Sequence, residues 1–350
     1  MKASYHKYIL NFKTPGGTSR GVLRQKETWF LILEQDSRLG IGECGLFRGL
    51  SADDLPDYAD RLRWLCENIE STPEQIRAEL WQYPSILFGW EQAMRSLSAR
   101  HPFHLFPSVF TEEEAPIPIN GLIWMGDPDY MQQQIQQKID QGFRCLKMKI
   151  GAIDFESEIA LLRGIRNVFP SSELEIRVDA NGAFSPDEAL QKLDQLAPIE
   201  IHSIEQPIRQ GQPELMRNIC ASTPIPVALD EELIGIHLTA TKEELLARVK
   251  PQYIILKPSL VGGYRSSEEW IKIAAAQGCG WWITSALESN VGLNAIAQWT
   301  FTLESDMPQG LGTGSLFTNN FESPLTVSNG CLYYSPEKKW DQTIISRICT

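Results

Sequence analysis

The sequence predicts an α/β fold, namely a (β/α)7β TIM-like barrel with an α+β capping domain. From residue 116 onward, short apolar segments alternate with amphipathic segments of helical length, which is the pattern of parallel strands joined by crossover helices. Eight strand candidates lie between about residues 116 and 317, each of the first seven followed by a helix, and such a series favours a closed barrel. An open, doubly wound sheet is the weaker alternative, because no Gly-x-Gly-x-x-Gly follows the first strand.

Residues 1–115 show a different pattern and are expected to form the capping domain, completed by residues 318–350. Strand-like segments cover residues 4–13, 19–35 and 39–45, and helical segments cover residues 53–69 and 85–100. Asn329-Gly330 predicts a tight hairpin in the C-terminal segment, which returns to pack on this domain. No low-complexity linker precedes the barrel domain, residues 116–317, so a close interface between the two domains is expected.

The strand candidates of the barrel are residues 116–123, 143–151, 174–182, 201–208, 225–233, 253–260, 281–289 and 310–317. Helix signals lie between them. Asp127 or Asp129 is expected to cap the first helix, and Gly142 to end it. Asp154 caps the second helix, and Ser185 precedes the third.

The composition is that of an ordinary soluble globular protein of 350 residues, with 43% hydrophobic and 22% charged residues. A net charge of −12 argues against binding to nucleic acid or to an anionic membrane surface. The seven cysteines are scattered without a CxxC pair, so neither a disulfide framework nor a zinc site is indicated. With no signal peptide and no apolar run of about 18 residues, the protein is expected to be cytoplasmic. The oligomeric state stays open.

Two lysines lie on one face of the second barrel strand. Because side chains alternate along a strand, Lys147 and Lys149 share a face opposite to apolar neighbours. Both faces of a parallel barrel strand are covered, so this face points into the barrel. An unpaired buried charge costs at least several kcal/mol, so partners must come from other strands.

Charged residues end the next four strands. These residues are Asp179, Glu205, Asp230 and Lys257, spaced by one strand-helix unit of about 25 to 30 residues. Equivalent positions at the carboxyl ends of barrel strands converge in space, where active sites of such barrels lie. The sequence therefore predicts one cluster of three carboxylates and three lysines.

Three converging carboxylates repel one another unless a hard divalent cation lies between them. Oxygen ligands favour Mg²⁺, with Mn²⁺ as a possible substitute. A lysine near a cation and near another lysine is expected to have a lowered pKa, as a general base requires. The cluster therefore suits removal of a proton from the carbon next to the carboxylate of a small-molecule substrate, with the metal stabilising the resulting enolate.

Other interpretations stay open at this point. The charged cluster could be a structural salt-bridge network, and Lys147 alone could be either a supporting charge or a chemical group. Asn181 and Glu231 lie next to ligand candidates and are either groups that support the ligands or ordinary loop residues.

These residues resemble the enolase superfamily, in its muconate-lactonising subgroup. The segments KMK, RVDANGAF, IEQP, ALDE and LKPSLVGG match in kind, order and spacing, over nearly the whole chain. The resemblance implies that Asp179, Glu205 and Asp230 bind magnesium. It also implies that Lys149 is the acid/base and that Lys257 faces it across the substrate. The seventh strand, residues 281–289, lacks the histidine of a mandelate-racemase-like arrangement.

Within the subgroup, the segments SALESNVG, GLGTGSLF, TPGGTSRGVL and GECGLFRGLS are similar to the o-succinylbenzoate synthase family. This implies a syn dehydration of 2-succinyl-6-hydroxy-2,4-cyclohexadiene-1-carboxylate to 2-succinylbenzoate in menaquinone biosynthesis. Lys149 would remove the proton and then protonate the departing hydroxyl, and Lys257 would stabilise the enediolate. Candidate substrate contacts are Ser285, Ser289, Gly312, Thr313, Arg20 and Arg48.

Two alternative functions accompany this reading. N-succinylamino acid racemases share the scaffold and both lysines. Dipeptide epimerases are a weaker match, because they usually have Asp-x-Asp at the eighth strand, where this chain has Gly312, Thr313 and Gly314. The alternative from another class is a non-catalytic barrel that binds a metabolite.

Overall fold

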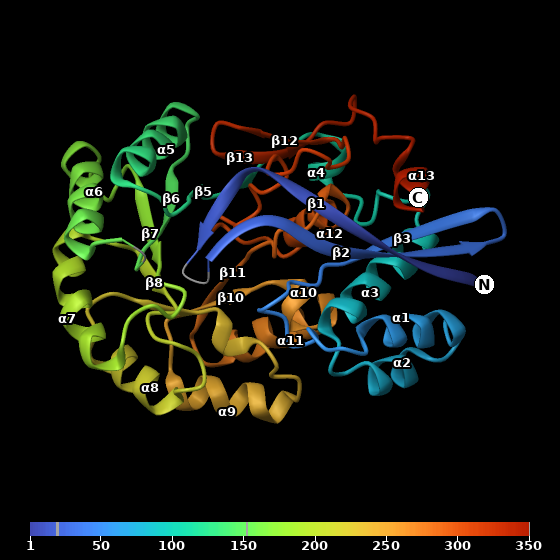
Figure 1. Ribbon diagram of the computed structural model, residues 1–350, viewed down its shortest axis with the longest axis horizontal. Helices are drawn as coiled ribbons and strands as arrows, with labels where there is room; N and C mark the ends of the chain where they lie inside the picture. Colours follow the sequence, from blue (N-terminus) through green and yellow to red (C-terminus); the bar gives the residue numbers. More distant parts are fainter. Residues whose placement is uncertain (19–20, 152, 350) are drawn as a thin grey trace.

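The structure is a computed structural model that describes residues 1–18, 21–151 and 153–349. Seven parallel strands form one curled sheet in the order β11-β10-β9-β8-β7-β6-β5 (Figure 1). Their bounds are β5 Gly121–Ile123, β6 Cys145–Lys149, β7 Glu175–Asp179, β8 Ser203–Glu205, β9 Val227–Leu229, β10 Tyr253–Leu256 and β11 Gly280–Ile283. Each strand pairs with its neighbour in the sequence, as in a barrel, which confirms the predicted α/β class.

Helices follow the strands and lie on the outside of the sheet (Figure 1). They are α5 Pro128–Asp140, α6 Phe155–Val168, α7 Pro186–Leu196, α8 Pro213–Ser222, α9 Thr239–Val249, α10 Pro258–Val261, α11 Gly263–Ala276 and α12 Asn290–Phe301. Asp127 caps α5 by accepting a hydrogen bond from the Tyr130 amide at 2.9 Å. Asp154 caps α6 in the same way. The expected caps are therefore confirmed, with Asp127 rather than Asp129 at the first helix.

The segment expected as the eighth strand is irregular. In the described chain it forms isolated bridges, between Ile119 and Gln309 and between Thr284 and Gly310, which close the ring between β11 and the first strand. The reason is its glycine content: a Cβ at Gly310 would lie 2.4 Å from Thr284 Oγ1, so only glycine permits this close approach. The expected first strand is also divided, because β4, Ile117–Pro118, pairs with the C-terminal strand β13 instead of β6.

The N-terminal region combines an antiparallel sheet with helices. The sheet has the order β1-β2-β3, with β1 Lys2–Thr18, β2 Gly21–Gln35 and β3 Arg38–Cys44. The helices are α1 Tyr58–Glu67, α2 Pro73–Glu79, α3 Pro84–Ser98 and α4 Val109–Glu112. Helix α3 packs directly on β3, since a Cβ at Gly42 would lie 1.9 Å from the Gly89 carbonyl oxygen.

The C-terminal segment contacts both regions. It contains β12 Leu325–Ser328, β13 Cys331–Tyr334 and α13 Ile344–Ile348. Asn329 and Gly330 have φ values of 49° and 68°, as the predicted hairpin turn requires. Trp340 and Ile344 join the core of β2 around Phe30. The domain boundaries at residues 115/116 and 317/318 stay a prediction.

The long β1–β2 hairpin extends from the N-terminal region towards the barrel strands (Figure 1). Gly17 forms a bridge with Met125, which follows β5, and Phe12 forms one with Phe317. The capping region therefore reaches the carboxyl end of the barrel. Among the described residues, no helix is both long and apolar enough to cross a membrane.

Candidate active site

A cavity of about 440 Å³ lies where the capping region meets the carboxyl ends of the barrel strands. The barrel contributes polar residues of the predicted cluster to its wall, namely Lys147, Lys149, Asp179, Asn181 and Lys257. The capping region contributes apolar residues, among them Leu23, Phe47 and Leu50. The cavity therefore has a charged floor and an apolar roof, a combination typical of small-molecule sites.

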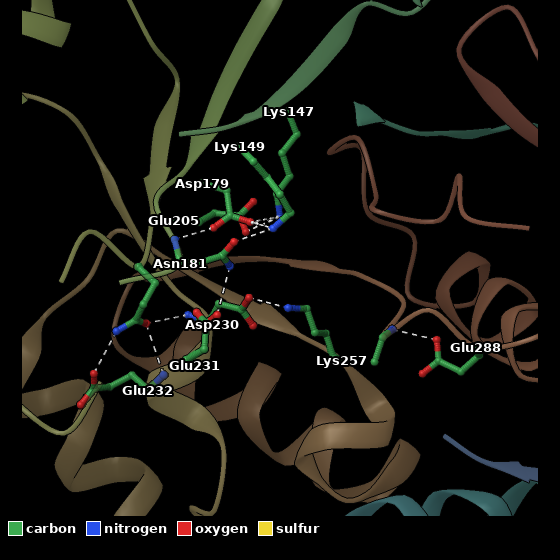
Figure 2. Close-up of polar contacts among 12 residues, drawn as sticks. Lys147, Lys149, Asp179, Asn181, Glu205, Asp230, Glu231, Glu232, Lys257 and Glu288 are labelled. Atoms are coloured by element: carbon green, nitrogen blue, oxygen red, sulfur yellow. Dashed lines mark hydrogen bonds and ion pairs between the residues drawn. The ribbon is translucent and has the colours of Figure 1, made fainter. Parts of the chain in front are cut away.

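The strand register explains why the charged residues converge. Lys149 and Asp179 are Cα partners on β6 and β7, and Asp179 and Glu205 are partners on β7 and β8. Asp230 directly follows β9, and Lys257 directly follows β10. The predicted equivalence of these positions is therefore present in the fold (Figure 2).

Each lysine is paired with a carboxylate. The Lys147 Nζ contacts Glu205 and lies 3.1 Å from Asp179 Oδ2. The Lys149 Nζ lies 3.0 Å from the same Asp179 oxygen. Lys257 pairs with Asp230 and approaches the cluster from another side (Figure 2). Since the three carboxylates are at most 2% exposed, these pairs exist in a low-dielectric environment.

The two carboxylates nearest the lysine pair have opposite pKa shifts. Burial raises the pKa of Asp179, but the charges of Lys147 and Lys149 outweigh burial and hold it far below its usual range. Burial raises the pKa of Glu205 to about 7, and the charges of Asp179 and Asp230 add to the rise, against the effect of Lys147. The cluster therefore contains one carboxyl group whose negative charge is incompletely stabilised.

Two lysines of the cluster, Lys257 and Lys147, have raised pKa values in this arrangement. Burial lowers the pKa of Lys257, but the charges of Asp230 and Glu231 outweigh it and the net shift is upward. The pKa of Lys147 is raised for the same reason, by Asp179 and Glu205. The expected lowering of a lysine pKa assumed a cation bound beside the lysine, so it stays a prediction; in this structure carboxylates are the nearest charges to Lys147 and Lys257.

Asn181 and Glu231 support the cluster. The Asn181 Oδ1 accepts a hydrogen bond from Lys149 at 2.6 Å, and its Nδ2 donates to Glu231 Oε1 at 3.0 Å. Gln206 extends the network, because its Oε1 accepts from the amides of Asp230 and Glu232. These bonds join the loops that follow β7, β8 and β9, and thereby hold the carboxylates at the carboxyl ends of the strands.

The donor set fits a hard divalent cation. Asp179, Glu205 and Asp230 offer carboxylate oxygens, and the buried Glu205 Oε1 has no hydrogen-bond partner in the structure. Nevertheless, nowhere in the described chain do three acidic, histidine or cysteine side chains form a group arranged to hold an ion. The ammonium groups of Lys147, Lys149 and Lys257 contact these carboxylates and offset part of their charge.

The structure brings three of the candidate substrate contacts to the cavity. Ser285, Gly312 and Thr313 line the cavity, and the hydroxyls of Ser285 and Thr313 lie 2.7 Å apart. Ser289 is fully buried and donates its hydroxyl to Glu43, away from the cavity wall. Arg48 pairs with Glu27 and Asp54. Arg20 lies outside the described residues.

Several wall residues have no counterpart in the sequence-based prediction. They are mostly apolar or aromatic, with two lysines: Lys13, Leu23, Phe47, Leu50, Leu122, Trp124, Tyr130, Lys138, Leu260 and Leu287. An apolar residue in a strand or loop gives no sequence signal that separates a cavity wall from a core. The glycine-rich turns near Gly16 and Gly45 were the available sign that capping loops approach the site.

The family model described as enolase C-terminal domain-like matches residues 130–338. The o-succinylbenzoate synthase of Desulfotalea psychrophila is 48% identical, over 95% of this chain and 98% of that protein. The crystal structure of MenC from the same organism matches with a TM-score of 0.84 and 43% identity, covering 95% of this chain and 99% of that one.

The chain belongs to the o-succinylbenzoate synthase family. It is therefore an enzyme of the enolase superfamily, a lyase by family. More distant structures share the o-succinylbenzoate synthase fold alone: the L-Ala-D/L-Glu epimerase from Bacillus subtilis has 19% identity and a TM-score of 0.81, covering 97% of this chain and 98% of that one. Muconate lactonizing enzyme from Pseudomonas fluorescens has 20% identity and a TM-score of 0.81, covering 99% of this chain and 98% of that one.

Proposed function

We propose that this protein catalyses the syn dehydration of 2-succinyl-6-hydroxy-2,4-cyclohexadiene-1-carboxylate to 2-succinylbenzoate, in menaquinone biosynthesis. The observation that supports it best is the pair of lysines, Lys149 and Lys257, which line one cavity beside three buried carboxylates in a chain of this family. A cytoplasmic location belongs to the same proposal, and the seven free cysteines agree with it.

Lys149 is the proposed acid/base. Its Nζ is held by Asn181 at 2.6 Å and by Asp179 at 3.0 Å, which fixes its direction into the cavity. After it has lost a proton to solvent, the amine takes the proton from the carbon next to the substrate carboxylate. In a syn elimination the hydroxyl leaves from the same face, so the same ammonium returns that proton and releases water.

Lys257 is the proposed electrostatic partner. It projects from the end of β10, and its ammonium charge stabilises the negative charge that develops on the enediolate oxygens. Asp179, Glu205 and Asp230 would hold Mg²⁺, or Mn²⁺ in its place. When bound, that ion supplies positive charge next to the substrate carboxylate. Lys147, paired with Asp179 and Glu205, keeps their charges balanced.

The remaining wall binds and orients the substrate. Ser285 and Thr313 offer adjacent hydroxyls for polar groups of the succinyl chain, and Leu23, Phe47 and Leu50 cover the cavity from the capping region. This cover reduces the contact of the site with solvent, which strengthens the charge interactions in it. Arg48 has no part in this assignment because its partners are Glu27 and Asp54.

The decisive experiment is turnover of the diene acid by the purified protein with Mg²⁺. We expect the absorbance of the cyclohexadiene to fall as the aromatic product forms. Unchanged absorbance at micromolar enzyme would refute the proposal. The protein without added metal, treated with a chelator, is the control.

A second candidate activity is racemisation of N-succinylamino acids. It is favoured by one observation: two lysines, Lys149 and Lys257, line the same cavity from different strands, as a base on each side of one carbon requires. Incubation in deuterium oxide should then exchange the α-hydrogen of an N-succinylamino acid. An unexchanged α-hydrogen would exclude it.

A further inference from the structure

Three charged side chains are buried where the capping region meets the loop after β11. Glu43 lies on β3, Lys26 on β2, and Glu288 on the loop, and they are 0%, 5% and 0% exposed, respectively. The proposed reaction uses none of them. Figure 2 shows Glu288 beyond Lys257, on the side away from the carboxylate cluster. Because a buried charge needs compensation, this cluster requires its own explanation.

Glu43 binds the start of helix α12. Its carboxylate accepts hydrogen bonds from the Ser289 amide at 2.9 Å, the Ser289 hydroxyl at 2.5 Å and the Gly292 amide at 2.9 Å. A fourth bond comes from Thr28 Oγ1 at 2.8 Å. A carboxylate at a helix N-terminus meets unsatisfied amides and the positive end of the helix dipole. A capping-domain residue therefore holds the end of a barrel loop.

Glu288 holds the other end of the same loop. Its Oε2 accepts from the Ala286 amide at 2.7 Å, and its Oε1 accepts from the Ser259 hydroxyl at 2.5 Å. Ala286 follows Ser285, the cavity residue, and Ser259 lies two positions after Lys257. Glu288 thus links the loop after β11 to the segment that positions Lys257.

Lys26 compensates both carboxylates. Its Nζ is buried without a hydrogen-bond partner in the structure. Burial lowers its pKa, and the charges of Glu288 and Glu43 oppose that shift, so the three groups interact as one cluster. Without the ammonium, the charges of two buried carboxylates would lose the cation that opposes them.

The backbone of the loop shows that its position is imposed. Leu287 has a φ of 62°, a left-handed conformation that a leucine adopts only when its surroundings favour it. Its side chain packs with Leu10 and Phe12 of β1 and with Phe317. Leu287 also lines the cavity. Two strands of the capping region, β1 and β3, therefore fix one short barrel loop.

We infer that Glu43, compensated by Lys26 and coupled through Glu288, is a positioning residue for substrate selection. Through residues 285–289 it sets the place of Ser285 and Leu287 in the cavity wall. It touches neither the reacting carbon nor the proposed acid/base, so its effect is on substrate binding. This inference goes beyond the proposed function, but its kinetic readout relies on the diene acid as substrate.

The test compares Glu43→Gln with a matched control, Glu27→Gln. Glu27 lies on β2, has a side chain that is 14% exposed and pairs with Lys7 and Arg48, so the control makes the same charge change without contacting the loop. The Thr28→Val variant removes one bond to Glu43 and leaves its charge in place. Unfolding temperatures identify any variant that fails to fold.

Two readouts are expected to change together. Amide hydrogen exchange in the segment 284–292 should accelerate by roughly tenfold or more in Glu43→Gln, and less in Thr28→Val. The KM for the diene acid should rise roughly tenfold, with kcat within about threefold of the wild type. Glu27→Gln should change neither quantity.

Other results would overturn the inference. Unchanged exchange in Glu43→Gln would show that Glu43 does not hold the loop. Faster exchange with an unchanged KM, or a fall in kcat alone, would show that the loop position does not select substrate. If Glu43→Gln does not fold, Thr28→Val decides on the same criteria. If the wild type does not turn over the diene acid, the proposed function fails, and the exchange comparison still decides whether Glu43 holds the loop.

Discussion

Lys149 and Asp179 are Cα partners on adjacent parallel strands, and their side chains form an ion pair of 3.0 Å at the barrel mouth. The pair places the proposed base beside a proposed metal ligand. Lys149→Ala should lower kcat by roughly 10² to 10⁴-fold, because proton transfer loses its catalyst. Asp179 keeps Lys147 as a partner, so the unfolding temperature should change little. Steady-state kinetics measure kcat, and circular dichroism measures the unfolding temperature. Lys192→Ala on α7 is the control. An active Lys149→Ala variant would exclude Lys149 as the base.

Removal of divalent metal should abolish turnover, and Mg²⁺ should restore it. Glu205→Gln should weaken Mg²⁺ binding at least tenfold, because it removes a carboxylate whose Oε1 has no other partner in the structure. Isothermal titration with Mg²⁺ alone measures this independently of activity. Glu200→Gln, at an exposed position, is the control. Full activity after exhaustive chelation would contradict the assignment.

Arg48→Met should leave kcat/KM within about twofold of the wild type. Its guanidinium pairs with Glu27 and Asp54 in a half-exposed position, and such pairs stabilise by about 1 kcal/mol at most. Urea unfolding should therefore show a small loss of stability. A loss of activity greater than tenfold would return Arg48 to the substrate site.

Asp53 should make the stability of the protein depend on pH. Burial raises its pKa to about 6, against hydrogen bonds from the Ser85 amide and hydroxyl. Because the folded state binds the proton more tightly than the unfolded state, Asp53 opposes folding above pH 6. Stability should therefore rise as the pH falls below 6, by about 1.4 kcal/mol per pH unit until the unfolded chain also binds the proton.

The Asp53→Asn variant isolates this contribution. All other titrating groups are shared with the wild type, so the difference in unfolding free energy between the two proteins gives the effect of Asp53 alone. Urea titrations at pH 7 and pH 5 measure it. If the difference is the same at both pH values, folding does not raise the pKa of Asp53 above about 5.

Much of the barrel could be predicted because its determinants are local. Alternation of apolar and amphipathic segments depends on burial, and Asp127 and Asp154 cap their helices through bonds to residues three positions away. The eighth strand, expected at residues 310–317, was harder to predict, because its path depends on contact between Gly310 and Thr284, which lie far apart in the sequence. Tertiary contact there replaces regular strand pairing.

The polar floor of the site could also be predicted, since charges at buried strand ends are rare and their spacing follows the strand-helix unit. The contacts of loop residues could not be predicted in this way. Ser289 and Arg48 belong to loops, but their partners, Glu43 and Glu27, are fixed by packing that the sequence does not display. For the same reason, Leu23 and Phe47 gave no sign that they cover a cavity.

The packing of the C-terminal segment on strand β2 has a consequence for biosynthesis. Trp340 and Ile344 complete an apolar cluster around Phe30 and Ile32, which the ribosome makes some three hundred residues earlier. During translation those early side chains lack their final cover. We therefore expect the nascent chain to expose this apolar cluster of β2 until α13 has been synthesised. Chaperones that bind exposed apolar segments should recognise it during that time.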